Sequence, residues 1–106
     1  MAPLLRVVHD GNKYATIKYK NIEIETRFHE IEIKDLFINA LREIENEELY
    51  EYDKNSKHGS ATLGLMYSAI DDEVTIIYSV ESTIDHRPTI SKVKLVVPFD
   101  DFMQTD

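Results

Sequence analysis

The stretch that decides the fold is IKDLFINALREIENEE, residues 33–48. Its apolar residues recur three and four positions apart, a spacing that predicts an amphipathic helix with one apolar stripe. The stripe consists of Ile33, Leu36, Phe37, Ala40, Leu41 and Ile44. A single helix of this kind needs an apolar surface to cover, and the rest of the chain predicts only strands and turns.

Short segments with alternating apolar and polar residues lie on both sides of this helix. The pattern predicts strands at residues 4–9, 14–19 and 22–28, and again at 61–70, 74–83 and 90–99. With a three-residue first loop and a two-residue second loop, the apolar residues of the first three strands share one face. That face would carry Leu5, Val7, Ala15, Ile17, Tyr19, Ile22, Ile24 and Thr26.

The predicted fold class is α+β, as one domain over residues 1–106 with loose ends at 1–3 and 100–106. Short connections favour antiparallel neighbours, so we expect a two-layer sandwich. It would have about six mostly antiparallel strands in the order βββ-α-βββ, with the helix across one face. A curled, barrel-like sheet around the helix is the alternative. Residues 49–60 are expected to form a frayed turn and a polar loop. The helix start is uncertain because no capping Ser, Thr, Asp or Asn precedes Lys34.

Composition restricts the classes of partner. The 106 residues carry a formal net charge of −8, which disfavours direct binding to nucleic acid or anionic membranes and favours a basic protein. Cysteine is absent, which excludes disulfides and thiolate metal sites. No apolar run is long enough to span a membrane. We therefore expect a cytoplasmic protein.

Motifs for catalysis or cofactor binding are absent from the sequence. The four histidines match no metal-site spacing, and the acids at 71–73 lack the alternate positions of a calcium loop. The three glycines are too far apart for a phosphate loop, and no GxSxG occurs. We predict no enzyme, no metal and no cofactor. A site in the loop with Asp85 and His86 is the remaining enzymatic alternative.

An acidic segment is the most unusual feature of the sequence. Between Glu30 and Asp53 there are nine carboxylates against two basic residues. Glu43, Glu47 and Glu51 follow one another at a spacing of four, where like charges repel and the helix dipole disfavours them. An ordinary solvated helix face is the simpler interpretation, but a repeated local cost indicates a function. The predicted partner-binding residues are Glu43, Glu47, Glu48, Tyr50, Glu51, Tyr52 and Asp53.

The two tyrosines are included because tyrosine beside carboxylates is typical of binding hot spots. Alternatively, they close the end of the core. The expected function is that of a small acidic inhibitor which blocks a basic toxin or defence nuclease by electrostatic complementarity. In general profile, although in no motif, the chain resembles bacterial immunity proteins and phage-encoded inhibitors of host defence nucleases. The alternative is a homodimeric structural or regulatory adaptor that associates through the outer sheet face.

Overall fold

The computed structural model describes residues 5–9, 13–42, 49–56, 59–84 and 87–105. The first half of the chain forms three strands and a helix: β1 (Leu5–Val8), β2 (Thr16–Tyr19), β3 (Ile22–Glu25) and α1 (Glu30–Arg42). The second half forms four longer strands and a short helix: β4 (Leu49–Ser56), β5 (Gly59–Ser68), β6 (Glu73–Ile84), β7 (Arg87–Pro98) and α2 (Phe99–Met103).

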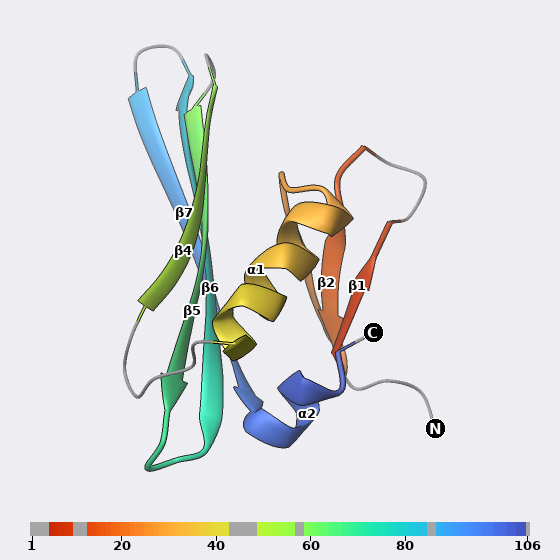
Figure 1. The fold of residues 1–106 in the computed structure, drawn as a ribbon. Coiled ribbons are helices and arrows are strands. Elements are labelled where there is room, and N and C mark those ends of the chain that lie inside the picture. The colour runs from red at the N-terminus through yellow and green to blue at the C-terminus, as the bar shows by residue number, and fades with distance from the viewer. Residues whose placement is uncertain (1–4, 10–12, 43–48, 57–58, 85–86, 106) are drawn as a thin grey trace.

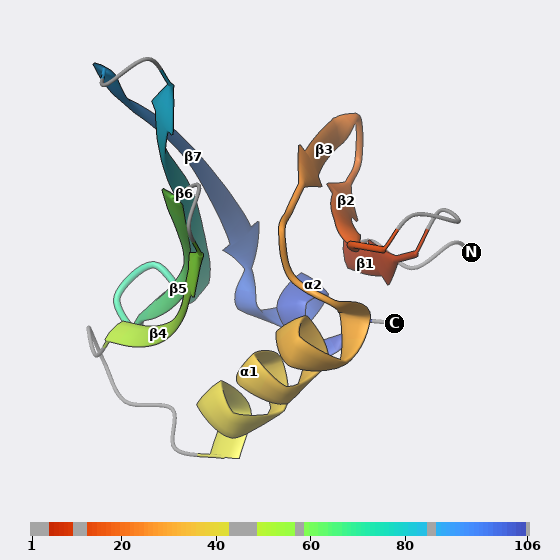
Figure 2. The same cartoon turned by 90° about the horizontal axis from the view of Figure 1, so that it is seen from above.

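The strands form two antiparallel sheets, in the orders β1-β2-β3 and β4-β5-β6-β7. The predicted α+β class and the antiparallel pairing are confirmed, but the prediction of one six-stranded sheet with a single helix was wrong. Each half pairs locally through short connections, and α1 separates the two halves in the chain. Figure 1 and Figure 2 together place α2 between the two sheets and α1 across one open side of the gap, where it contacts β1 and β4, so both helices contribute to covering the core.

The predicted apolar face of the small sheet and its two-residue second loop are confirmed, but the three-residue first loop was wrong, since the pairing of β1 with β2 already ends at Val8 and Thr16. Val7 pairs with Ile17, and Ile17 pairs with Ile24, so their side chains share one buried face. Just beyond the paired strands, the buried hydroxyl of Thr26 donates a hydrogen bond of 2.7 Å to the carbonyl oxygen of Ala15. This bond satisfies the one buried polar side chain among the described core residues.

The large sheet contains a strand that the sequence pattern did not indicate. The prediction of a turn and loop at residues 49–60 was wrong, since β4 occupies Leu49–Ser56 and pairs with β5. Tyr50 lies opposite Leu65 and Tyr52 opposite Leu63, so both tyrosines extend the apolar face of the sheet. At the start of β5, Gly59 has a φ of 136°, and a Cβ there would lie 1.9 Å from the carbonyl oxygen of Glu81. The hairpin therefore requires glycine at this position.

The helix α1 begins at Glu30, three residues before the predicted start. Its first turn is capped from within the helix, because a carboxylate oxygen of Glu32 accepts a hydrogen bond of 2.8 Å from the backbone amide of His29. In return, the carbonyl of His29 accepts from the amide of Ile33 at 3.1 Å. The Glu32 bond is one half of a capping box. The predicted end of the helix falls beyond Arg42, outside the described residues.

The expected loose tail at residues 100–106 is instead a docked helix for most of its length. In α2, Phe102 is buried, with its ring centroid 5.0 Å from that of Phe37 on α1. The backbone amide of Phe99 donates to the carbonyl of Asp72 at 2.9 Å. Burial of Phe102 and partial burial of Phe99, three residues before it, explain why this segment orders.

One hydrophobic core joins both sheets and both helices. Phe28, which follows β3, meets the rings of Tyr52 and Tyr78 edge-on at centroid distances of 5.7 Å and 6.1 Å. The backbone amide of Arg27 also donates to the Tyr78 hydroxyl at 2.8 Å. Figure 2 shows the two sheets from above, with α2 between them. In the described part of the chain, no helix has the length and hydropathy needed to cross a membrane.

Candidate protein-binding surface

The structure describes four of the seven predicted partner-binding residues, and all four lie on β4. They are Tyr50, Glu51, Tyr52 and Asp53. The other three, Glu43, Glu47 and Glu48, lie outside the described residues. Because β4 is the first strand in the order of the large sheet, it is an edge strand. No strand among the described residues pairs with its outward side.

The predicted tyrosines and carboxylates lie on opposite faces of the sheet, because side chains alternate along a strand. Tyr50 is half-buried and packs against the core, beside Leu65 and Phe102. Tyr52 lies edge-on to the Phe28 ring and keeps 39% of its surface exposed. On this inner face the tyrosines cover the core, which is the alternative that the sequence left open.

Glu51 and Asp53 are exposed on the outer face of the large sheet. The side chain of Glu51 lies beside Gly64 on the neighbouring strand, with its Cγ atom 3.7 Å from the position that a Cβ of Gly64 would occupy. Among the described residues, no ion pair joins either carboxylate to a neighbour. Their charges are thus available to a partner.

The outer face also carries positive charge, on the edge strand β7. On β7, Lys92 and Lys94 are exposed, and the strand register places them in the same rows as Asp53 and Glu51. Three strand spacings of about 4.8 Å separate β4 from β7. Opposite charges about 14 Å apart do not form an ion pair within one sheet.

Two acids of the predicted acidic segment form ion pairs within the chain, so they contribute less to the negative charge of its surface. A carboxylate oxygen of Glu32 lies 3.1 Å from the Nζ of Lys54. Burial alone would raise the pKa of Glu32, but the hydrogen bonds from the His29 amide and Lys54 outweigh it and lower this pKa. Glu30 pairs with Lys34 at 2.9 Å, one turn along α1, and this contact lowers the pKa of Glu30.

No family model, no curated protein and no solved structure matches this chain.

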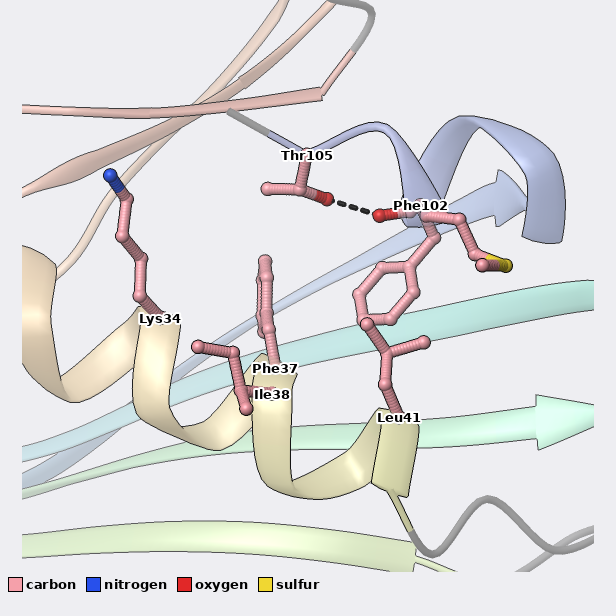
Figure 3. A pocket seen from close by; sticks show the side chains of 7 residues that line it. Lys34, Phe37, Ile38, Leu41, Phe102 and Thr105 are labelled. Atoms are coloured by element: carbon pink, nitrogen blue, oxygen red, sulfur yellow. Dashed lines mark hydrogen bonds between the residues drawn. The ribbon is translucent and has the colours of Figure 1, made fainter.

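A groove between the two helices was not predicted from the sequence. Its volume is about 240 Å³, and Figure 3 shows α1 side chains on one wall and Phe102 and Thr105 on the other. The lining residues are Lys34, Phe37, Ile38, Leu41, Phe102, Met103 and Thr105. The sequence signal for this wall was the helical spacing of Phe99, Phe102 and Met103, with Asp100 and Asp101 in the first turn of α2. The groove is mostly apolar and holds no group of acids.

Within the described ranges, no cluster of three or more His, Asp or Glu side chains is placed to hold a metal ion. The acidic turn at 71–73 is organised by local contacts instead. The hydroxyl of Tyr67 donates to Asp72 at 3.1 Å, which raises the pKa of Tyr67. Asp72 itself adopts a φ of 53°, as aspartate in tight turns tolerates. His58, Asp85 and His86 lie outside the described residues, so the loop of the enzymatic alternative does too.

Proposed function

We propose that this chain is a small acidic inhibitor, of the immunity-protein or phage anti-defence type. It would act by binding, without catalysis of its own, to a basic nucleic-acid-handling protein such as a toxin or defence nuclease. The observation that carries the proposal is the exposure of Glu51 and Asp53 on the edge strand β4.

The charge of the whole chain supports this proposal. A net charge of −8 produces a negative field that attracts a cationic nucleic-acid groove and speeds the encounter. The four acids of residues 43–48 immediately precede β4 in the sequence and add to the charge of this region. Carboxylates that occupy a cationic groove exclude the phosphates of the substrate by competition.

The test is an inhibition assay with a defined basic nuclease. The probe is the purified nuclease encoded nearest to the gene of this chain, and the readout is cleavage of a fluorescent oligonucleotide. We expect stoichiometric inhibition that weakens as salt rises, because salt screens the attraction. The variant E51K/D53K should inhibit at least about tenfold more weakly. The matched control E23K/E25K changes the same charge on β3 and should inhibit nearly as well as the wild type.

Absence of inhibition at a large excess of this chain would contradict the proposal. So would equal loss in E51K/D53K and E23K/E25K, since total charge rather than β4 would then be responsible.

A homodimeric adaptor is the second candidate function. The arrangement of opposite charges on the outer face of the large sheet favours it.

A further inference from the structure

The outer face of the large sheet carries apolar, small polar and charged side chains, and no described element covers it. Exposed apolar side chains lie on both of its edge strands, with Leu49 on β4 at 43% and Val96 on β7 at 44% exposure. The middle strands β5 and β6 carry mostly small side chains, so a second sheet can approach closely. Helices cover the inner face only (Figure 1).

The register orders this face into rows that cross all four strands. One row runs Glu51, Gly64, Ile77, Lys94. The next row runs Asp53, Thr62, Ser79, Lys92. A third row runs Leu49, Met66, Thr75, Val96. In two successive rows, therefore, a carboxylate at one end faces an ammonium group at the other.

We infer that this face binds a second copy of the chain, about a two-fold axis that runs roughly parallel to the strands between β5 and β6. Such an axis places β4 of one copy over β7 of the other and β5 over β6, at the same height along the strands. Glu51 then meets Lys94 of the second copy, and Asp53 meets Lys92. Leu49 meets Val96 in the third row.

The middle of the face fits the same axis. Ile77 of one copy lies over Gly64 of the other, where the side chains of Leu49 and Glu51 lie beside the glycine, so the contact at this position is partly apolar. Thr62 meets Ser79, which joins two small polar residues. An axis perpendicular to the strands would instead place β4 over β4 and bring like charges together. Charge complementarity thus selects one of the two face-to-face arrangements.

The size of the face indicates how strongly the copies associate. Four strands about 4.8 Å apart and three rows about 7 Å apart give roughly 400 Å² of projected face per copy. Stable interfaces bury about 800 Å² per partner, so this face is at the small end. The dimer is therefore reversible. It uses the carboxylates of the proposed inhibitory surface but does not depend on the inhibitory function, because no other partner takes part.

The experiment is sedimentation velocity of the full chain and its charge variants, over roughly 5 to 500 µM. The wild type should shift from monomer to dimer over this range. The variants E51K/D53K and K92E/K94E should each weaken the dimer at least about tenfold, because each brings like charges together. The control E23K/E25K makes the same charge change as E51K/D53K, but on the small sheet. It should dimerise as the wild type does.

Restoration of the dimer is the decisive measurement. Mixing E51K/D53K with K92E/K94E gives attractive contacts at both ends of a heterodimer, so a mixed dimer should form at concentrations where each variant alone is monomeric. The combined variant E51K/D53K/K92E/K94E should dimerise again by itself. Circular dichroism shows that each variant is folded. A wild type that stays monomeric at the highest concentration, or a mixture without restoration, would overturn the inference.

Discussion

Tyr19 and Asp101 are 82 residues apart in the sequence, yet the hydroxyl of Tyr19 donates a hydrogen bond of 2.7 Å to a carboxylate oxygen of Asp101. The contact joins β2 of the small sheet to α2 at the other end of the chain. Burial and the nearby carboxylate both disfavour the phenolate form, which raises the pKa of Tyr19 to about 12.

Removal of this hydrogen bond should destabilise the protein and change its behaviour at alkaline pH. Tyr19→Phe should lower the free energy of unfolding by about 1–2 kcal/mol in urea titrations at pH 7. Because the pKa is raised in the folded state, the stabilisation is complete below about pH 10 and is lost as pH rises towards 12. Wild type should therefore lose more stability than Tyr19→Phe over this range. Tyr67→Phe, at an exposed hydrogen bond, is the control and should change stability by less than about 0.5 kcal/mol.

The capping contact of Glu32 should stabilise the start of α1. Glu32→Ala removes both the bond to the His29 amide and the ion pair with Lys54, and should cost about 1–2 kcal/mol at pH 7. Since the pKa of Glu32 is lowered in the folded state, its contribution is present above about pH 4.5 and is lost as pH falls through the folded value. Urea titrations from pH 7 to pH 3 should show the difference between wild type and variant shrinking. A constant difference would contradict the role of the charge, and Glu30→Ala, at an exposed ion pair, should have little effect.

Docking of α2 can be tested at its buried aromatic residue. Phe102→Ala should lower the free energy of unfolding by about 3–5 kcal/mol, because it leaves a cavity against Phe37. Met103→Ala, at a neighbouring side chain with 59% exposure, should change it by less than about 0.5 kcal/mol. Equal, small effects of the two substitutions in thermal unfolding would mean that the segment does not dock.

The acids that precede β4 provide a test of the proposed inhibitory surface. E43K/E47K/E48K should fold, since these positions lie off the predicted apolar stripe. Binding to the basic nuclease should weaken by more than about 1–2 kcal/mol, chiefly through a slower association rate in surface plasmon resonance. Unchanged affinity would remove residues 43–48 from the binding surface.

Self-association and inhibitor binding should compete, because both use Glu51 and Asp53. K92E/K94E weakens the homodimer but keeps these carboxylates, so its apparent affinity for the nuclease should fall much less than that of the wild type as its own concentration rises. Wild type should show such a fall, since only the monomer presents the surface. K13E/K20E, which makes the same charge change at exposed positions before β2 and in the turn after it, should behave as wild type does. Identical behaviour of the two variants would show that the dimer does not cover the inhibitory surface.

Local patterns predicted the hairpins well. The alternation in residues 14–28 placed Ile17, Tyr19 and Ile24 on one face, and the structure buries all three. The same holds for the large sheet, where Leu63, Ile76 and Leu95 lie inward as expected. Alternation within a strand is a local pattern, so the sequence shows it directly. It also restricts the register, because a shift by one residue would expose every apolar side chain.

The strand β4 escaped prediction because its signal is weak. Residues Asp53, Lys54 and Asn55 have low strand propensity, and only the partner strand β5 supplies the hydrogen bonds that hold them. Lys54 faces inward, where its ammonium group lies over the Tyr14 and Phe28 rings and pairs with Glu32. A lysine in such a place is stabilised by side chains that are distant in the sequence.

By itself, the sequence determined the strands with clear alternation, the stripe of α1 and the excess of negative charge, because these depend on residue type and short spacing. Only the tertiary structure decided that there are two sheets, that the last residues dock as α2, and that the carboxylates of β4 and the lysines of β7 lie at opposite edges of one face. Those relations arise from pairing and packing between segments far apart in the chain, where the favourable energy comes from surfaces that no local pattern contains.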